Sequence, residues 1–510
     1  MVKKTFLILL LIGIVFAVYA NSLKGPFLFD DTILVRDNPL IRSITNISAF
    51  FKTDIFAHTT EGLPISNSYR PLQTVTYALD FFLWGNSPQG FHLTSVIIHI
   101  INTLLVFLFI KKISGNFSIS YLTSLIFGIH PINTQCVSYI SGRADLLVAT
   151  FTLLSIITYI NSKKDKKKGT LFLSALFYLF AIYSKEIAII ILPLILVIYN
   201  IISDKEKTYR PRSYIFHAAA LALYFPQRLA ALDGLVPCAL ELSRLDIFPR
   251  VFTSIKSLFI DVRMLLFPYD LHFGRTTDVE SSIFGSIYSI LTVAGIILAA
   301  YMLHLMYKRW QEKKDAGSAQ IFFGISFFLV TMAPLLNIVP LQVFHSDNWL
   351  YLPAVGIYLA FIAFVKSLIT SKQSLAKGMA PILTIAALFY YGHTTIERNK
   401  DYQDEIRFFL SSLEKRPSVK FCRTVGALYG ERGDYEKSIK YLNMAVETNK
   451  IYPAKEEAEL AYFNLGITYM NLGKYKEAKE SFEKVLISTN VELRLEAERH
   501  FVHIVNNLMQ

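Results

Sequence analysis

The sequence predicts an all-α protein in which about eleven transmembrane helices precede a soluble helical domain at the C-terminus. Of the 510 residues, 53% are hydrophobic and only 18% are charged, whereas a soluble protein carries about a quarter charged residues. Apolar runs long enough to cross a bilayer recur from the N-terminus to residue 396. Charged residues become frequent after residue 400. We therefore expect a membrane domain at 1–398 and a second domain at 399–510.

The membrane domain consists of apolar segments separated by polar gaps. We expect spans near residues 5–20, 93–110, 119–132, 144–160, 170–184, 186–202, 213–229, 283–307, 319–340, 349–368 and 378–396. Two long connections, 21–92 and 230–282, are expected to lie outside the cytoplasm. With an odd number of spans beginning inside, residues 399–510 lie outside as well.

The formal net charge of +12 reflects this topology and does not require a nucleic-acid partner. Lys and Arg concentrate in alternate polar gaps, which is the positive-inside pattern of membrane proteins. These basic gaps are Lys111-Lys112, 163–168, 205–212, 308–314 and 366–377. Each of them falls on the cytoplasmic side of the predicted threading.

The first apolar segment follows Lys3-Lys4 and ends near Ala20. It is typical of a cleavable signal peptide, with a cleavage-like sequence at 18–20, or of a retained first helix. We favour a retained helix, because polytopic proteins commonly keep their first segment. In either case the loop that follows lies outside the cytoplasm.

Residues 250–268 alternate between apolar and charged side chains, among them Lys256, Asp261 and Arg263. Charges at the centre of a bilayer are costly, so we expect an amphipathic helix in the membrane interface here. If this segment instead crossed the membrane, the C-terminal domain would be cytoplasmic.

The C-terminal hundred residues contain two copies of one pattern. Gly426, Tyr429, Gly433, Tyr435, Ser438 and Leu442 recur at identical spacing as Gly466, Tyr469, Gly473, Tyr475, Ala478 and Phe482. This pattern resembles the tetratricopeptide repeat, in which small residues let paired helices pack closely. With flanking helices at 404–416 and 490–507 it predicts a short solenoid. A generic pair of helical hairpins is the alternative.

Two adjacent aspartates, Asp30 and Asp31, stand in the first outside loop. Neighbouring carboxylates repel each other, so one is held at a raised pKa unless a cation or a hydrogen-bond donor compensates. Arg36 is the neutralising charge nearby in sequence. The pair is therefore the first candidate for a functional site.

Other polar residues map to the same side of the membrane, and ionisable groups gathered at one membrane face indicate a functional site. They are Arg70, His92, His99, His130, Arg143, Asp145, Lys185, Glu186 and His345. The three cysteines, Cys136, Cys238 and Cys422, are widely spaced and form no metal or redox motif, so they indicate no disulfide framework.

Several of these residues also have purely structural interpretations. Arg143 and Asp145 could instead pair with each other structurally. Adjacent Lys185 and Glu186 suit an ion pair that caps a tight turn. His99 fits a hydrogen bond between helices better than catalysis, and Tyr69-Arg70-Pro71 suits an interfacial anchor.

Eight short motifs follow one another along the membrane domain. They are Phe-Asp-Asp at 29–31, Tyr-Arg-Pro-Leu at 69–72, Phe-His at 91–92, His-Pro at 130–131, Gly-Arg-Ala-Asp-Leu-Leu at 142–147, Ser-Lys-Glu at 184–186, Leu-Phe-Pro at 266–268 and Trp-Leu-Tyr-Leu-Pro at 349–353. With the repeat tail, they resemble the transmembrane and tetratricopeptide-repeat O-mannosyltransferase family and its prokaryotic relatives. The resemblance covers nearly the whole chain, but the tail has far fewer repeats than the animal members carry.

The resemblance implies a C-type (GT-C-like) glycosyltransferase that inverts the sugar as it transfers it. The donor would be a polyprenyl-phosphate sugar such as a dolichyl phosphate, carrying mannose or another hexose. The acceptor would be a Ser or Thr hydroxyl of a protein or peptide on the extracytoplasmic face. We expect an integral protein of a prokaryotic plasma membrane, or of the endoplasmic reticulum in a eukaryote.

The same resemblance implies roles for the candidate residues. Asp30 would be the general base and Asp31 would bind acceptor or sugar, or the reverse. Positive charge would stabilise the departing phosphate, first from Arg143 and then from Arg70 and Lys185. The histidines that would donate to the phosphate or to sugar hydroxyls are His92, His130 and His345. No cofactor is firmly implied, and a divalent cation between the two carboxylates stays an open alternative.

Three rival functions remain. A non-enzymatic scaffold would recruit partners through its repeats, and Asp30→Asn and Asp31→Asn would then be silent. A transporter would carry charged or broken helices at mid-membrane, of which the sequence shows few. A polysaccharide polymerase or ligase would use the same lipid donor but leave proteins unmodified.

Overall fold

The protein is helical throughout the part described in this computed structural model, which comprises residues 2–57, 68–165, 167–203, 214–232, 245–275, 278–282, 284–341, 343–370 and 374–508. The predicted basic gap at 205–212 and Cys238 lie outside these ranges. Other predicted segments lie partly outside them, among them the connections 21–92 and 230–282 and the basic gaps 163–168 and 366–377. The chain forms two compact units. One comprises Met1–Leu271 and Thr276–Gln403, and the other comprises His272–Arg275 and Asp404–Gln510.

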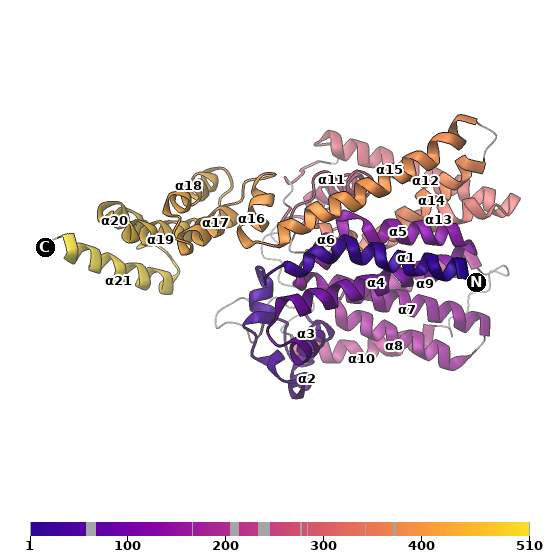
Figure 1. The fold of residues 1–510 in the computed structure, drawn as a ribbon, viewed down its shortest axis with the longest axis horizontal. Helices are drawn as coiled ribbons and strands as arrows, with labels where there is room; N and C mark the ends of the chain where they lie inside the picture. Colours follow the sequence, from indigo (N-terminus) through magenta and orange to yellow (C-terminus); the bar gives the residue numbers. More distant parts are fainter. Residues whose placement is uncertain are drawn as a thin grey trace. The chain divides into compact units, whose positions relative to one another are not determined.

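The first unit is a bundle of apolar helices (Figure 1). Its long helices are α1 (Val2–Tyr19), α3 (Pro71–Trp84), α4 (Pro88–Ser114), α5 (Phe117–Ile129), α7 (Arg143–Asp165), α8 (Lys168–Ser184), α9 (Ala188–Ser203), α10 (Ile215–Ala231), α11 (Ile247–Leu266), α12 (Ile287–Lys313), α13 (Ala316–Met332), α14 (Ala354–Thr370) and α15 (Ser374–Asn399). Each predicted span corresponds to one of these helices. The remaining two, α3 and α11, belong to the predicted outside connections.

Five helical stretches of the described chain are long and apolar enough to cross a membrane. They are Val2–Lys24, Pro88–Ser114, Ile140–Asp165, Ile287–Lys313 and Ala316–Leu335. Four shorter apolar helices accompany them, within α5, α8, α9 and α14. The protein is therefore an integral membrane protein with several candidate spans, and the full number of about eleven stays a prediction.

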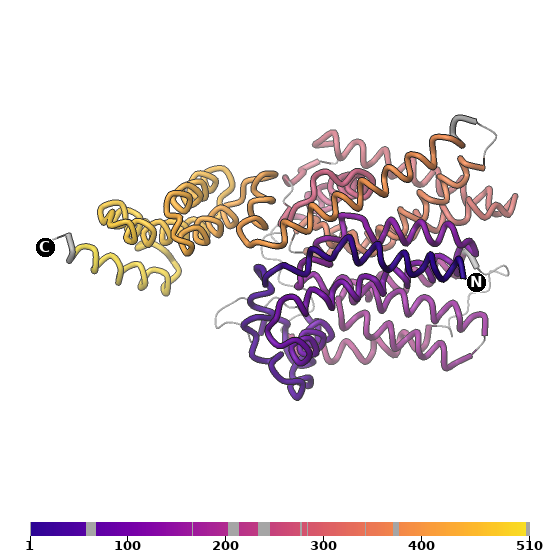
Figure 2. The backbone as a smooth tube through the Cα atoms, in the orientation of Figure 1, coloured from indigo at the N-terminus to yellow at the C-terminus, as the bar shows by residue number. Residues whose placement is uncertain are grey.

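Short polar sequences end one helix and begin the next. Helix α4 begins with Pro88 in its first turn and ends at Gly115, whose φ of 65° suits glycine because it has no Cβ. Helix α5 begins immediately afterwards, where the Asn116 side chain accepts a hydrogen bond from the backbone N–H of Ile119 (3.1 Å). This tight connection makes α4 and α5 antiparallel neighbours, as the backbone trace shows (Figure 2).

Small residues let the helices approach closely within the bundle. Gly324 of α13 and Gly356 of α14 face each other, and a Cβ added at Gly324 would lie 2.6 Å from the carbonyl oxygen of Gly356. Between α7 and α8, Ser155 and Ser174 exchange hydrogen bonds with each other's carbonyl oxygens (2.7 and 2.8 Å). Small and hydroxylated residues are the usual means of joining helices inside a bilayer.

The predicted amphipathic segment at 250–268 is helical and forms α11. Its charged side chains have partners in the first unit. Asp261 contacts the ring Nδ1 of His345 (3.1 Å), and Lys256 pairs with Glu280 (2.7 Å). Among the described helices, α11 is not one of those apolar enough to be a candidate span, so its location in the membrane interface stays a prediction.

The second unit contains α16 (Glu405–Leu413), α17 (Val419–Glu431), α18 (Tyr435–Ile451), α19 (Lys455–Asn471), α20 (Tyr475–Glu483) and α21 (Val491–Leu508). The helices α17–α18 and α19–α20 form the two predicted repeats. Gly426 packs against Leu442, and Gly466 packs against Phe482, with a hypothetical Cβ 2.6 Å from each neighbouring side chain. The turns match as well, because Gly433 and Gly473 both have positive φ (78° and 70°). The predicted small-to-bulky packing and flanking helices are confirmed.

Candidate active site

The acidic pair lies in a sharp turn whose backbone is strained. Phe29 has a φ of 46°, which is rare for a residue with a side chain. The Asp31 N–H closes the turn on the carbonyl of Leu28 (2.8 Å). A π-helical turn, Thr32–Arg36, follows directly, and such turns are frequent at functional sites. These local features hold Asp30 and Asp31 in different environments.

Asp31 is fully buried, and both of its carboxyl oxygens are occupied. Oδ1 accepts hydrogen bonds from the N–H and the hydroxyl of Ser141 (2.7 and 2.5 Å), and Oδ2 accepts one from the N–H of Leu28 (3.1 Å). Burial raises the pKa of Asp31 to about 7, although the hydrogen bonds from Ser141 and Leu28 oppose the shift. The charge of Asp30 adds to the rise. The predicted raised pKa in the pair therefore falls on Asp31.

Asp30 is only partly buried, and its neighbour is Tyr139. The Asp30 N–H donates to the Tyr139 hydroxyl (3.1 Å), and the phenol also forms a side-chain hydrogen bond with Asp30. Burial, followed by the charges of Asp30 and Asp31, raises the pKa of Tyr139 well above its usual value. The phenol therefore stays protonated at neutral pH and is able to donate its hydrogen.

The segment that contacts the pair is itself held by two further elements. Gln73 of α3 donates to the carbonyl of Ser141 (3.0 Å), and Tyr77 of α3 donates to the carbonyl of Ile140 (3.0 Å). Ser138 donates to the side chain of Asn399, at the end of α15 (2.9 Å). Helices α3 and α15 thus fix the connection at 138–142 on which the acidic turn rests.

Arg143 follows this segment and is completely buried. Its guanidinium lies 2.5 Å from Asp80 and donates to the carbonyl of Phe91 (2.8 Å). The rings of Tyr77 and Phe91 lie 4.9 and 5.8 Å from it. The Arg143–Asp145 ion pair suggested by the sequence does not form, because Asp80 takes that place. In this environment the guanidinium is not accessible to a phosphate group.

Asp145 instead pairs with Lys185, so the Lys185–Glu186 pair considered from the sequence does not form either. The Lys185 ammonium lies 2.5 Å from Oδ1 of Asp145, while Asn348 donates to Oδ2 (2.8 Å). Both charged side chains are almost completely buried, at 8% and 6% exposure. The network joins the segments around 145, 185 and 348, which are far apart in the sequence.

Glu186 lies between two arginines. Arg70 and Arg228 approach its two carboxyl oxygens at 3.5 and 3.3 Å, and the Tyr69 N–H donates to it (2.8 Å). Arg70 is 26% exposed, whereas Arg228 is 3% exposed. Arg70 is therefore the most accessible of the cationic candidates, and Arg228 is a member of the site that the sequence did not single out.

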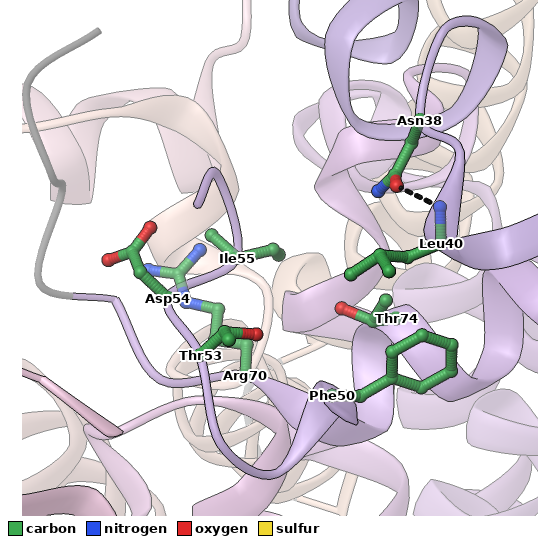
Figure 3. A pocket seen from close by; sticks show the side chains of 8 residues that line it. All are labelled: Asn38, Leu40, Phe50, Thr53, Asp54, Ile55, Arg70 and Thr74. Atoms are coloured by element: carbon green, nitrogen blue, oxygen red, sulfur yellow. Dashed lines mark hydrogen bonds between the residues drawn. The ribbon is translucent and has the colours of Figure 1, made fainter. Parts of the chain in front are cut away.

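Arg70 also lines a small pocket in the first outside connection (Figure 3). Its other lining residues are Asn38, Leu40, Phe50, Thr53, Asp54, Ile55 and Thr74. Asp54 accepts hydrogen bonds from the N–H groups of Phe56 (2.8 Å) and Ser68 (2.7 Å). The pocket therefore combines one cation with one anion and several hydrogen-bonding groups.

The four candidate histidines are buried. His99 bonds to the hydroxyl of Tyr351 (2.7 Å) and the carbonyl of Gly128 (3.0 Å), which confirms its structural interpretation. His130 Nδ1 accepts the N–H of Ile132 (3.2 Å). His345 contacts Asp261, as described above, and His92 lies beside Gly25.

Four of the candidates meet at residues 138–145, which are the connection at 138–142 and the start of α7. Asp30 contacts Tyr139, Asp31 contacts Ser141, Lys185 contacts Asp145, and Arg143 lies within the segment. Gln73, whose side chain donates to the carbonyl of Ser141, also gives its backbone N–H to the carbonyl of Arg70 (3.1 Å). Tyr139 and Ser141 were not recognised from the sequence as partners of the acidic pair. Within the described chain, no group of three or more His, Cys, Asp or Glu side chains is arranged to hold a metal ion.

These observations define a class of protein, a helical integral membrane protein with an acidic turn beside buried cations and a separate repeat unit. The tetratricopeptide repeat family matches residues 460–487. Human protein O-mannosyl-transferase TMTC3 is 25% identical over 514 residues, covering 93% of this chain and 54% of that protein. The F38B6.6 protein O-mannosyl-transferase of Caenorhabditis elegans is 24% identical over 447 residues, covering 84% and 61%.

Human protein O-mannosyl-transferase TMTC4 is 25% identical over 477 residues, covering 83% of this chain and 64% of that protein. This chain is a homologue of the transmembrane and tetratricopeptide-repeat protein O-mannosyltransferases, which confirms the resemblance carried by the motifs. It spans about half the length of the first of these relatives.

A solved structure of the Archaeoglobus fulgidus oligosaccharyltransferase, tethered to an acceptor peptide, is also similar. Its TM-score is 0.45 at 10% identity, covering 86% of this chain and 58% of that chain. A similarity at this level does not establish a shared fold.

Proposed function

We propose that this protein is a membrane glycosyltransferase that uses a polyprenyl-phosphate sugar as donor. It transfers mannose or another hexose to Ser or Thr hydroxyls of proteins on the extracytoplasmic face, with inversion. The observation that carries the proposal is the acidic turn, in which partly exposed Asp30 stands beside fully buried Asp31. Homology to protein O-mannosyl-transferases supports the substrate class.

In the proposed reaction, the carboxylate of Asp30 removes the proton from the acceptor hydroxyl. The hydroxyl oxygen forms a bond to the anomeric carbon while the bond from that carbon to the phosphate oxygen breaks. The bonding electrons leave with the polyprenyl phosphate, and one base opposite the leaving group is sufficient for inversion. Losing this base should reduce the rate by about 10²–10⁴-fold.

The departing phosphate needs positive charge nearby. Arg70 is the preferred candidate because it is the most exposed of the three and its contact with its carboxylate partner, Glu186, is the longest (3.5 Å). A guanidinium binds phosphate through paired hydrogen bonds. Lys185 follows, although its ammonium already pairs with Asp145. Arg143, the first candidate from the sequence, is the least favoured of the three, because its buried guanidinium already pairs with Asp80. A donor-binding role for His92, His130 and His345 stays a prediction, since their rings are buried.

Glycoproteomics of cells that carry the wild type or the Asp30→Ala/Asp31→Ala variant tests this function. We expect hexose-modified secreted peptides to disappear in the variant while the protein still reaches the membrane. Unchanged glycopeptides would refute the protein transferase and favour a scaffold. Loss of a cell-surface polysaccharide with intact glycopeptides would instead identify a polysaccharide polymerase or ligase.

A further inference from the structure

The connection at 138–142 contacts both members of the acidic pair through two different side chains. Ser141 gives its N–H and its hydroxyl to one carboxyl oxygen of Asp31, at 2.7 and 2.5 Å. The backbone N–H of Leu28 donates to the other oxygen (3.1 Å). Neither carboxyl oxygen of Asp31 is therefore open to the hydroxyl of an acceptor substrate. The exposure of Asp31 is 0%. Asp31 thus anchors the turn.

Tyr139 contacts Asp30 in two ways. Its hydroxyl accepts the backbone N–H of Asp30 (3.1 Å) and forms a side-chain hydrogen bond with Asp30. A phenol has one hydrogen to donate and lone pairs to accept, so one hydroxyl serves both interactions. Tyr139 therefore orients the backbone and the carboxylate of Asp30 together.

The connection is rigid enough to impose this geometry. Gln73, Tyr77 and Asn399 hold it from two helices, as described above. Gly142 leaves no space for a side chain, because a Cβ there would lie 2.5 Å from the carbonyl oxygen of Gln135 and 2.9 Å from Cα of Cys136. Fixed groups lose little freedom when substrate binds, which is how a preorganised site gains rate.

We propose that Tyr139 and Ser141 are positioning residues that hold Asp30 toward the acceptor hydroxyl, with Asp31 as the anchor between them. This inference rests on the proposed function. It assigns Asp31 a role in placing Asp30 and removes it from the residues that touch sugar or acceptor. The titratable groups around the pair are Tyr139, Tyr77 and, beyond Tyr77, the ion pair of Arg143 with Asp80.

The test measures kcat, donor KM and the pH dependence of kcat for the full-length Tyr139→Phe variant in detergent, with a polyprenyl-phosphate mannose donor and a Ser/Thr peptide. We expect kcat to fall about 10–100-fold while KM changes little, because a misplaced reacting group affects mainly the chemical step. The acidic limb of the kcat–pH profile should move to higher pH, because the Asp30 carboxylate becomes more basic when it loses the hydrogen bond from Tyr139.

Tyr351→Phe is the matched control, because Tyr351 is also buried and its hydroxyl also bonds to two groups, His99 (2.7 Å) and Asn102 (3.1 Å). It should lower the melting temperature without moving the pH profile. Ser141→Ala should reduce kcat, and Ser141→Thr, which keeps the hydroxyl, should restore it.

The failures are distinguishable. If the wild-type protein transfers no sugar from the donor to the peptide, the proposed function itself is wrong. If Asp30→Asn keeps full activity, the assignment of Asp30 as the base is wrong, and the positioning role falls with it. If Asp30→Asn is inactive but Tyr139→Phe keeps the wild-type kcat and pH profile, only the positioning role is wrong.

Discussion

At the scale of single residues, Asp30 and Asp31 are adjacent yet differ in what they can do. Asp31 has a folded pKa of about 7, raised by burial from an ordinary value of 3.8. Between these values, the folded protein holds a proton that the unfolded chain has released. Its contribution to stability is therefore complete below about pH 4 and is lost as the pH rises through about 7.

We therefore expect the melting temperature of the wild type to fall more steeply from pH 5 to pH 8 than that of Asp31→Asn, which has no such proton. Thermal unfolding in detergent at a fixed heating rate measures both curves. The difference in melting temperature between the two proteins at each pH removes the contribution of the titratable groups that both contain. Parallel curves would show that Asp31 does not titrate in this range.

Arg143 gives a prediction about stability. Arg143→Gln leaves Asp80, which is 3% exposed, without its cation. Removing one partner of a buried ion pair costs about 3–5 kcal/mol. Asp80→Asn/Arg143→Gln should recover part of this loss. The control is Arg36→Gln in the exposed Arg36–Asp37 pair (51% and 55% exposed), where we expect a change within about 0.5 kcal/mol.

The same variants test the alternative role of Arg143. If Arg143→Gln kept the wild-type melting temperature and raised the donor KM, the guanidinium would be a donor ligand and the structural assignment would be wrong.

Arg70 is the residue for which we predict a change in donor binding. A hydrogen bond to a charged group contributes about 1.5–3 kcal/mol, so Arg70→Gln should raise the donor KM about 10–100-fold. Inhibition by free polyprenyl phosphate should weaken in parallel, and Arg70→Lys should retain part of both. Arg42→Gln, an exposed position in the same outside connection, is the control. Equal donor KM values for Arg70→Gln and Arg42→Gln would exclude Arg70 from the phosphate site.

At the scale of elements, hydrophobicity predicted the helices well because it is a local property. The runs at 93–110 and 144–160 lie within α4 and α7, and both helices carry two lysines in their last turn. The pairing of charges depends on how distant segments meet, which is why the sequence suggested Asp145 for Arg143 and the structure shows Asp80. Ser141 and Asp31 are 110 residues apart in the chain, so their contact has no local signal.

The acidic turn shows the same limit. Asp30 and Asp31 stood out because two like charges are unusual beside a membrane segment. The positive φ of Phe29 and the π-helical turn after Asp31 could not be predicted, since neither glycine nor proline marks them. Arg228 escaped notice because it lies inside an apolar segment that otherwise reads as a span.

The contact between α13 and α14 gives a prediction for an element pair. In Gly356→Ala the new Cβ would clash with the carbonyl of Gly324 and with the N–H of Phe328, both parts of the backbone. Because backbone cannot rotate aside as a side chain does, the helices must separate. We expect a lower melting temperature, measured as above. Gly295→Ala in α12, where nothing lies within 4 Å, is the control and should be neutral or slightly stabilising.

At the scale of the whole molecule, the two units contain different functional elements. The first unit holds the acidic turn and all the candidate catalytic and donor-binding residues. The second holds two tetratricopeptide-like repeats, whose stacked helices form the kind of surface that binds an extended chain. If the second unit is extracytoplasmic, it is able to hold acceptor proteins on the face where the proposed transfer occurs. The orientation of the C-terminus therefore bears directly on the proposed function.

That orientation depends on α11. With eleven spans and α11 in the interface, the C-terminus is outside; if α11 crossed the membrane, it would be cytoplasmic. The charged side chains of Lys256, Asp261 and Arg263 on α11 favour the interface, because charged groups are costly at mid-membrane. A phosphatase that is active only outside the cytoplasm, fused after Gln510, should be active, and a fluorescent protein that folds only inside should be dark. Fusions after Gly115, in the predicted cytoplasmic gap between α4 and α5, should give the opposite pattern. If the phosphatase after Gln510 is inactive while the fusions after Gly115 behave as expected, α11 crosses the membrane. The repeats would then be cytoplasmic and could not hold an extracytoplasmic acceptor.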